Sequence, residues 1–345
     1  MKRFSCFLLS ALLMAALTLP AAAVTKVRGY PGFADIPSTE SPYFGPVKAC
    51  YEAGLLNGVT DTAFEPQGNL SIAQLVVLAA RLYNIQQGGK GEIPALPTEA
   101  MMKTSCLRFY DDGGTLLKSF RPGDMVTFNA LGDGLFLSLS ETPDDPALPE
   151  TCTMEVGLEG YGSPRRYEGA RESYTPLPGV MTQGFSGTGY RFLDENAAAA
   201  TMFFLGFDQE LADRLNGAWW FPAAFYLASE GCFNLSGDLI YRANPKHEED
   251  YDPLTGFRAP ASRAFFAWLV DAVTGELPAL NEAVSIPDVT EETPDAEAIL
   301  RLYRAGVLTG VDAAGNFKGS APLTRGQAAI LLSRVIEPTA RKGAA

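Results

Sequence analysis

Few residues of this 345-residue chain could carry out catalysis. The single histidine, His247, lies in the polar segment 245–250, which is more typical of a solvated loop than of a metal site. The segment 184–187, Gly-Phe-Ser-Gly, resembles the start of a serine nucleophile elbow, but Thr188 stands where a glycine is needed. No histidine is placed to activate Ser186, so we expect no Ser–His–Asp site.

Metal and cofactor sites are not indicated either. Asp250, Asp252 and Gly256 resemble a calcium-binding loop only in part, because the acidic residue that should close the loop is missing. The chain has no Cys-x-x-Cys pair for zinc. An acidic protein supplies many carboxylate pairs of the kind that glycosidases use, and nothing singles out two of them here. We therefore expect no catalytic residues, no metal ion and no cofactor.

Composition and the first residues indicate an exported globular protein. The formal net charge of −13 argues against nucleic acid and against anionic membrane surfaces as partners. Lys2 and Arg3 precede the short apolar run 7–19, and Ala21-Ala22-Ala23 follows it, a pattern typical of a secretory signal peptide over 1–23. No later stretch is apolar enough to predict a transmembrane span.

Four cysteines lie beyond that signal peptide: Cys50, Cys106, Cys152 and Cys232. An exported protein can oxidise its thiols, and Cys106 and Cys152 both fall in the central region. They are the favoured disulfide pair. The alternative is that all four are free, buried thiols.

Two stretches about 250 residues apart repeat the same residues in the same order. Gly54 and Gly306 are 252 positions apart, and Phe64 and Phe317 are 253 apart. Each copy also holds an acidic residue after an apolar one (Asp35 and Asp288) and a Ser/Thr–Gln spacing (Ser71 with Gln74, Thr324 with Gln327). An internal repeat of this length determines the architecture.

Each copy is predicted to form a helix, a loop and a second helix. Ser41-Pro42 and Thr293-Pro294 are suited to begin the first helix, and Gly54 and Gly306 to end it in a left-handed conformation. Ser71 with Gln74, and Thr324 with Gln327, form the capping-box pattern that opens the second helix. Two short amphipathic helices do not bury their apolar faces alone, so further copies are needed.

A third, divergent copy is indicated over 217–278. Trp220 and Gly231 are 11 residues apart, as are Tyr43 and Gly54. Ser262 then precedes an apolar helical run, 263–273.

Residues 91–216 fit no copy and have strand-like patterning. The predicted strands are 106–110, 125–128, 134–139, 152–158 and 201–205, with turn signals between them. We interpret this segment as a small antiparallel β domain inserted after the first repeat, with an unknown partner of its own. The fold class is therefore α+β.

These features resemble the S-layer homology (SLH) domain. The segments that correspond to its pattern are 33–35, 54–58, 64–66 and 323–327. The resemblance covers about half of the chain in three pieces. It implies three helical repeats around a pseudo-threefold axis with grooves between neighbours. The implied organisation is a signal peptide 1–23, repeat one 24–90, a β-rich insertion 91–216, a divergent repeat two 217–278, repeat three 279–338 and a tail 339–345.

The resemblance also implies a function, which is noncovalent attachment of an exported protein to the bacterial cell envelope. The ligand would be an anionic secondary cell-wall polymer, often pyruvylated, or peptidoglycan. The family's arginine position is filled by Arg325 and Arg263, each after a helix N-cap (Thr324 and Ser262), where guanidinium and helix dipole suit an anionic sugar group. Trp220 is expected to line a groove.

Repeat one has Ile72 at the arginine position, so we expect its groove to be silent. The expected location is the cell wall, S-layer or cell surface. Two alternatives stay open: a degenerate SLH scaffold for protein–protein assembly, and a wall-glycan enzyme whose site lies in the β insertion.

Overall fold

The computed structural model describes residues 24–37, 39–124, 126, 128–131, 134–140, 148–162, 164–174, 187–205, 214–215, 217–244, 246, 252–281 and 285–343. The expected signal peptide, the segment 184–186 and His247 lie outside these residues. None of the helices in the described part of the chain is both long and apolar enough to cross a membrane.

The chain forms two compact units that interleave along the sequence. One unit contains the residues up to Gly68, Leu277–Lys318 and the residues from Thr324 onward. The other contains Asn69–Glu276 and the short segment Gly319–Leu323.

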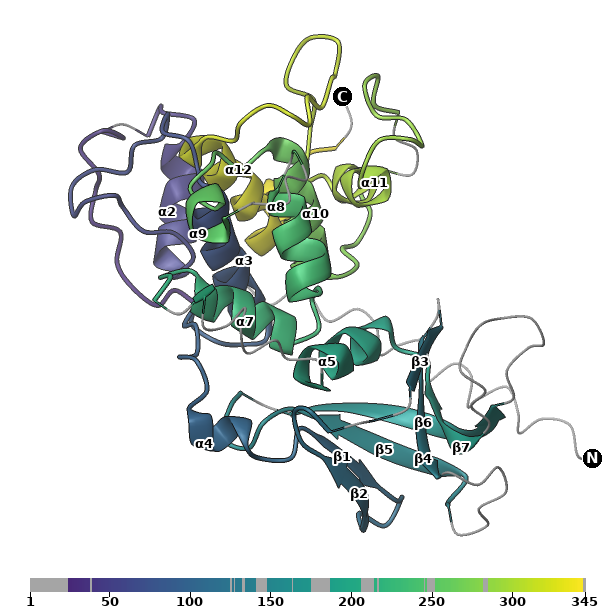
Figure 1. Cartoon of the computed structure of the whole chain (residues 1–345). Helices are drawn as coiled ribbons and strands as arrows, with labels where there is room; N and C mark the ends of the chain where they lie inside the picture. Colours follow the sequence, from purple (N-terminus) through teal and green to yellow (C-terminus); the bar gives the residue numbers. More distant parts are fainter. Residues whose placement is uncertain are drawn as a thin grey trace, which may run out of the picture. The chain divides into compact units, whose positions relative to one another are not determined.

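The first unit is helical. Its elements are α2 (Phe44–Glu52), α11 (Ala296–Arg304), α12 (Arg325–Ile336) and the 3₁₀ turn η2 (Pro338–Ala340). Helices α2 and α12 pack side by side (Figure 1), and the buried Cys50 Sγ lies 3.5 Å from the Ala329 carbonyl oxygen that accepts its hydrogen bond.

Helix α2 begins later than the sequence predicts, and so does α11. The residues at their N-caps are Tyr43 and Asp295, two positions after the expected Ser41 and Thr293. Both hydroxyls accept loop hydrogen bonds instead, from Tyr43 N (3.3 Å) and Thr290 N (2.9 Å). The predicted left-handed ends of these helices are confirmed, because Gly54 and Gly306 have φ of +80° and +71°.

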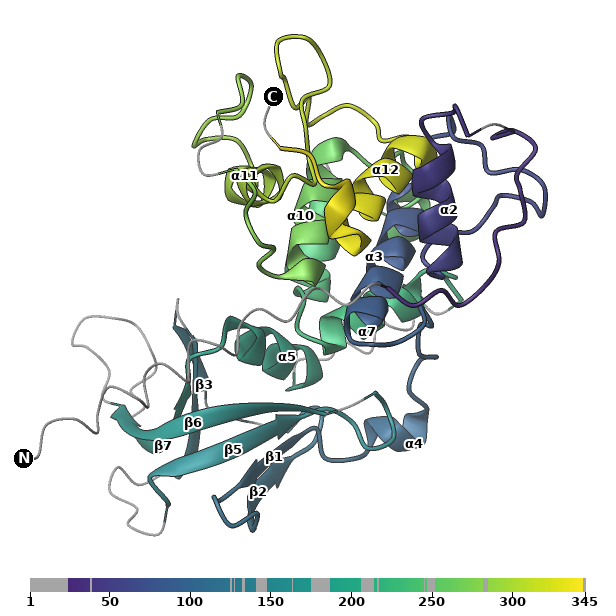
Figure 2. The same cartoon turned by 180° about the vertical axis from the view of Figure 1, so that it is seen from behind.

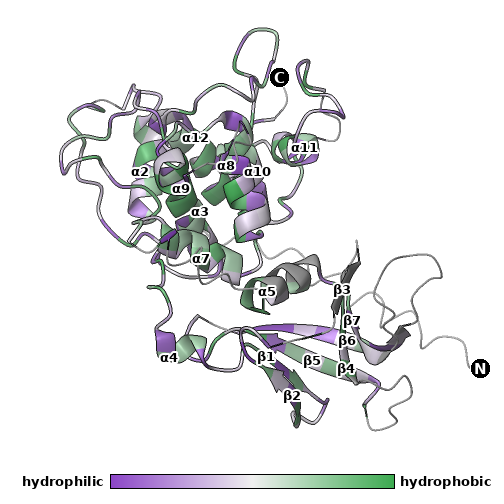
Figure 3. Cartoon of the chain, viewed as in Figure 1, coloured by the Kyte–Doolittle hydropathy of each residue, from purple (hydrophilic) through white to green (hydrophobic). Residues whose placement is uncertain are grey.

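The second unit holds the longest helices. Helix α3 (Ile72–Gln86) packs against α10 (Arg263–Thr274) and α7 (Phe221–Ser229). Figure 3 shows that α3 is strongly apolar, which agrees with the burial of most of its side chains. The short elements of this unit are α4 (Glu99–Met102), the π-helix η1 (Leu235–Ile240), α8 (Tyr241–Ala243) and α9 (Pro253–Gly256).

A seven-stranded antiparallel sheet completes the second unit, in the order β2-β1-β5-β6-β7-β4-β3. The strands are β1 (Leu107–Tyr110), β2 (Leu116–Phe120), β3 (Phe128–Leu131), β4 (Gly134–Ser140), β5 (Thr151–Val156), β6 (Arg165–Tyr174) and β7 (Gly187–Phe192). Lys118 Nζ of the edge strand β2 donates to Leu139 O of β4 at 3.2 Å. Because four strands separate β2 from β4 in the sheet order, this bond shows that the sheet curls.

The antiparallel sheet confirms the predicted α+β class, but one predicted strand is wrong. Residues 201–205 end α5 (Glu195–Leu205), a helix that packs on β4 and β5 and covers one face of the sheet (Figures 1 and 2). The alanines before Thr201 explain the difference, because alanine has the highest helix propensity. Strands β2, β6 and β7 were not expected.

The expected pair of Cys106 and Cys152 is also wrong, because all four described cysteines are free thiols. The register of β1 on β5 gives the reason. Cys106 O accepts from Gly157 N at 2.9 Å, whereas Cys152 lies five residues earlier along the same ladder. Five residues of strand span about 17 Å, and a disulfide needs Cα atoms within about 7 Å.

Candidate functional site

Three residues at the starts of the second helices form a closed ring of backbone hydrogen bonds. Leu70 N donates to Leu323 O (2.9 Å), Leu323 N to Ala261 O (2.9 Å), and Ala261 N to Leu70 O (2.8 Å). In the sequence each of these residues directly precedes an N-cap, Ser71, Thr324 or Ser262. The ring therefore has the threefold pattern that three equivalent copies would produce.

The three N-caps use their hydroxyls in the same way. Ser71 and Thr324 form complete capping boxes with Gln74 and Gln327, as predicted, and Ser262 accepts from Phe265 N at 3.1 Å. Satisfying these amide groups fixes the direction of each helix start.

Each helix start pairs with a loop through two backbone hydrogen bonds, and we name each such pairing a seam after its helix. In the α12 seam, Arg325 N and Gly326 N donate to Gly68 O and Pro66 O, both at 2.8 Å. In the α10 seam, the donors are Arg263 N and Ala264 N and the acceptors are Ala321 O (3.0 Å) and Gly319 O (2.9 Å). In the α3 seam, Ile72 N and Ala73 N donate to Ala259 O and Phe257 O, both at 2.9 Å.

Arg325 is the best defined cation of the α12 seam. Its Nε donates to Phe64 O and its Nη2 to Asn57 O, both at 2.8 Å, and its guanidinium lies 4.6 Å from the Phe64 ring centroid. The side chain makes no ion pair within the described residues, and the residue is 9% exposed. Burial lowers the pKa of Arg325, although the nearby Glu65 and Asp35 act in the opposite direction. Two of five guanidinium N–H groups are used, so three are left for a ligand.

A second arginine, which the sequence did not indicate, fixes the same loop. Arg28 Nη2 donates to Asn57 Oδ1 at 2.7 Å and also to the Leu56 carbonyl, while its Nε donates to Tyr51 O at 2.7 Å. Asn57 is therefore bonded through its side chain to Arg28 and through its carbonyl to Arg325.

Two aspartates hold the loop tips. Asp35 accepts from Phe64 N (2.9 Å) and Glu65 N (2.6 Å), and Asp288 accepts from Phe317 N (2.6 Å) and Lys318 N (2.7 Å). Glu65 and Lys318 have φ of +58° and +54°, so each aspartate stabilises a left-handed residue. The sequence showed these aspartates as part of the repeated motif, but it did not indicate that they accept hydrogen bonds from the loop amides.

Gly326, the second residue of α12, lies where the α12 seam leaves no room for a side chain. A Cβ at Gly326 would lie 2.6 Å from a Tyr43 ring carbon and 2.8 Å from Pro66 O. Tyr43 OH in turn accepts from Gln67 Nε2 at 3.2 Å. The aromatic N-cap of α2 thus packs directly against the start of α12.

The five site residues expected from the sequence lie at different seams. Thr324 and Arg325 form the α12 seam, and Ser262 and Arg263 form the α10 seam, where Arg263 is 5% exposed. Trp220 is 2% exposed, and its ring stacks on Phe257 of the α3 seam with 3.9 Å between centroids and 2° between planes. The exposed indole of this segment belongs to Trp219 (61%).

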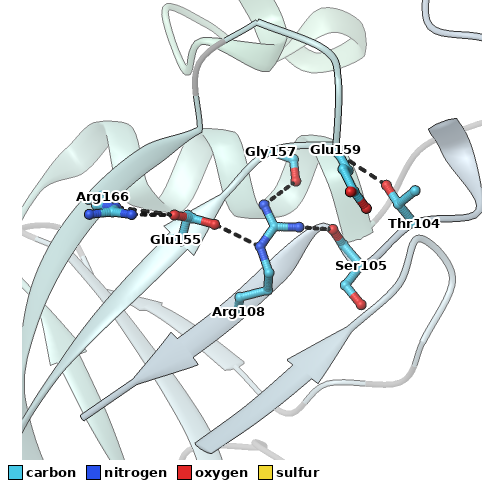
Figure 4. Close-up of polar contacts among 7 residues, drawn as sticks. All are labelled: Thr104, Ser105, Arg108, Glu155, Gly157, Glu159 and Arg166. Atoms are coloured by element: carbon cyan, nitrogen blue, oxygen red, sulfur yellow. Dashed lines mark hydrogen bonds and ion pairs between the residues drawn. The ribbon is translucent and has the colours of Figure 1, made fainter. Parts of the chain in front are cut away.

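The sheet carries a polar cluster on β1, β5 and β6 (Figure 4). Arg108 Nε and Arg166 Nη2 donate to the two carboxylate oxygens of Glu155 at 2.7 Å and 3.0 Å. Arg108 also donates to Ser105 O and Gly157 O. Burial of Glu155 would raise its pKa, but the two arginines hold that pKa below its usual range. A carboxylate bonded on both oxygens joins strands and is poorly suited to act as a general base.

A half-buried ion pair connects the sheet to the helices within the same unit. Arg165 of β6 donates twice to Glu230 Oε2, at 3.0 Å and 2.9 Å, and Tyr83 OH of α3 donates to the same oxygen at 2.9 Å. Glu230 is the C-cap of α7. The pair therefore fixes β6 against α3 and α7.

Comparison with protein families finds the S-layer homology domain at residues 32–75 and 285–329. These two segments contain Asp35, Asp288, Thr324 and Arg325. No curated protein and no solved structure matches the chain.

Proposed function

Because the chain contains S-layer homology domains, a family that mediates cell-wall anchoring, we propose that it is exported and attached noncovalently to the bacterial cell envelope through its seams. The ligand is an anionic group of a secondary cell-wall polymer or of peptidoglycan. Arg325 with Thr324, and Arg263 with Ser262, supply the two principal sites.

The observation that carries this proposal is the state of Arg325. Its guanidinium is held by two carbonyl oxygens, which fix its orientation but do not neutralise its charge. Among the described residues no carboxylate pairs with it. A positioned cation with unused N–H donors, beside a helix N-terminus, suits a carboxylate or phosphate group.

We further propose that 217–278 is the divergent third copy of the repeat. The N-caps Tyr43 and Trp220 have nearly the same backbone angles, with φ/ψ of −90°/−18° and −92°/−16°. Gly54, Gly231 and Gly306 all have φ between +71° and +80°. The closed ring of Leu70, Ala261 and Leu323 supports the same proposal.

Cosedimentation with cell-wall sacculi tests the function. We expect the full chain to pellet with native sacculi but not with sacculi stripped of secondary polymer by acid, if that polymer is the ligand. The double variant Arg263→Gln/Arg325→Gln should lose most of its binding. A control with the same charge change is Arg121→Gln/Lys90→Gln, since both residues are exposed and unbonded through their side chains within the described chain. Equal pelleting of both double variants would reject the two arginines as ligand residues.

The assembly alternative makes a different prediction. Ile72 at the α3 seam favours a scaffold that has lost ligand affinity, because an aliphatic side chain does not pair with an anion. If the wild-type chain pellets with neither kind of sacculus, the anchoring proposal fails and assembly with another surface protein takes its place.

A further inference from the structure

The three seams have a common geometry on the loop side as well as on the helix side. In each, one loop residue lies between the two residues whose carbonyls accept the helix N–H groups. This residue is Gln67 in the α12 seam, Ser320 in the α10 seam and Arg258 in the α3 seam. All three are exposed.

Compared position by position, each seam contains one arginine. The helix-side and loop-side residues are Arg325 and Gln67 in the α12 seam, and Arg263 and Ser320 in the α10 seam. In the α3 seam they are Ile72 and Arg258. The seam that lacks the helix-side arginine is therefore the one whose loop-side residue is an arginine.

The α12 seam shows that a side chain at the loop position reaches the wall of the seam. Gln67 Nε2 bonds to Tyr43 OH, and the Tyr43 ring packs against Gly326, the second residue of α12. Trp220 has the backbone conformation of Tyr43, and it stacks on Phe257, the direct neighbour of Arg258. Arg258 therefore occupies in the α3 seam the position from which Gln67 contacts the aromatic residue of the α12 seam.

Arg258 is also available for a ligand. Its backbone is fixed, because the residues on both sides of it bond to Ile72 N and Ala73 N at 2.9 Å. Its side chain makes no hydrogen bond, ion pair or ring contact within the described residues, whereas Arg108, Arg165 and Arg166 are each paired with a glutamate. Toward the described residues, the Arg258 guanidinium therefore has all five N–H donors open.

We propose that the α3 seam is a third anion-binding site, in which Arg258 supplies from the loop the charge that Ile72 does not supply from the helix. This proposal rests on the proposed function, because the ligand is the same class of anionic sugar group. It replaces the expectation of a silent groove in repeat one. Because Arg258 is exposed and Arg325 is buried, salt weakens binding at the α3 seam more strongly.

The test compares single variants in quantitative cosedimentation with native sacculi at low salt. Arg258→Gln places glutamine at the loop position, as in the α12 seam, and its binding should weaken by roughly 3- to 10-fold, a range typical of losing a charge-assisted contact. Arg258→Lys should retain part of the affinity because it keeps the charge. Arg121→Gln is the control, with the same substitution at an exposed arginine of the β insertion. At 1 M salt the difference between Arg258→Gln and Arg121→Gln should disappear.

Tryptophan fluorescence gives a readout local to this seam. Trp219 is exposed, and the buried Trp220 stacks on Phe257, the sequence neighbour of Arg258. The third tryptophan, Trp268, lies buried on α10. Polymer released from sacculi by mild acid should change the emission of wild type and of Arg263→Gln/Arg325→Gln, but not of Arg258→Gln.

The outcomes separate this inference from the proposed function. If Arg258→Gln binds like Arg121→Gln at low salt while Arg263→Gln/Arg325→Gln loses binding, the α3 seam is silent and the anchoring function stands. If Arg258→Gln and the double variant both bind like wild type, the arginine seams and this inference fail together. An unchanged melting temperature for Arg258→Gln shows that weaker binding does not come from unfolding.

Discussion

Arg325 donates from Nε to the Phe64 carbonyl and places its guanidinium over the ring of the same residue, 4.6 Å from the ring centroid. One side chain thus makes both a hydrogen bond and a cation–π contact with Phe64, which is buried in the first unit. The residues are 261 positions apart in the sequence. The pair joins the first and last repeats, so Arg325 has a structural role beside its proposed ligand.

Replacement of Arg325 should therefore destabilise the protein as well as weaken binding. Arg325→Gln removes the contact with Phe64 and a hydrogen bond to Asn57 O, and we expect a loss of about 1–3 kcal/mol, the range for hydrogen bonds from charged groups. Urea unfolding measures the difference. Arg121→Gln, whose side chain is unbonded within the described chain, should be neutral. A neutral Arg325→Gln would show that the Phe64 contact does not contribute to stability.

Asp288 should make stability depend on acid pH. Burial would raise its pKa, but hydrogen bonds from Phe317 N and Lys318 N lower that pKa overall. A carboxyl group whose pKa is lower in the folded state adds stability above its unfolded pKa, near 3.9, and loses this contribution as the pH falls through the folded pKa. Asp288→Asn should thus lower the melting temperature at pH 7.

Melting temperatures measured from pH 7 to pH 2 check this dependence. The gap between wild type and Asp288→Asn should shrink below about pH 4. Asp61→Asn, at an exposed residue that makes no side-chain bond in the described chain, should show no gap at any pH. A gap for Asp288→Asn that persists unchanged to pH 2 would argue against the ionised carboxylate as its cause.

The free thiols should be unreactive in the folded protein. Burial raises the pKa of Cys106, Cys152 and Cys232 to about 12, and it also raises that of Cys50. Few thiolates therefore exist at neutral pH, and the thiolate is the reactive species. We expect a thiol reagent such as DTNB to label the native chain very slowly and all four residues after unfolding. Fast labelling, or a melting temperature lowered by a reductant, would contradict the free buried state.

Local features of the fold were predictable from the sequence, because neighbouring residues determine them. The capping boxes at Ser71 and Thr324, and the left-handed ends at Gly54 and Gly306, involve residues within a few positions of one another. Features that depend on contacts between residues far apart in the sequence were not predictable. The sheet register separates Cys106 from Cys152. Residues 201–205, which were predicted as a strand, instead end helix α5, which packs on the sheet.

In the candidate site, too, local patterns were predictable and contacts between distant residues were not. The arginines after the N-caps were visible as a local pattern. The positions of Arg28 and Arg258 were not. Arg28 bonds to Asn57, 29 positions away, and Arg258 is placed by the bonds of its two neighbours with Ile72 N and Ala73 N. Comparing equivalent loop positions of the three seams singles out Arg258, but those positions are known only from the hydrogen bonds of the structure.

The half-buried ion pair of Glu230 and Arg165 gives the last prediction. Burial raises the pKa of Glu230, and the contacts with Arg165 only partly oppose this. A carboxyl group with a raised folded pKa favours folding below its unfolded pKa and loses that contribution as the pH rises through the folded pKa. Compared with Glu230→Gln, the wild-type chain should therefore lose stability as the pH rises above about 4, measured by urea unfolding.

Glu230→Ala should be much more harmful, because it leaves Arg165 in a largely buried place without its carboxylate. We expect a loss of about 1.5–3 kcal/mol, the range for hydrogen bonds to charged groups, because Arg165 keeps 28% of its side chain exposed to water. The control is Glu99→Ala, which removes one partner of the exposed pair with Lys103 and should change little. The same stability for Glu230→Ala and Glu99→Ala would mean that β6 is held against α3 and α7 by apolar packing alone, and that the Arg165–Glu230 pair does not determine how the sheet is attached.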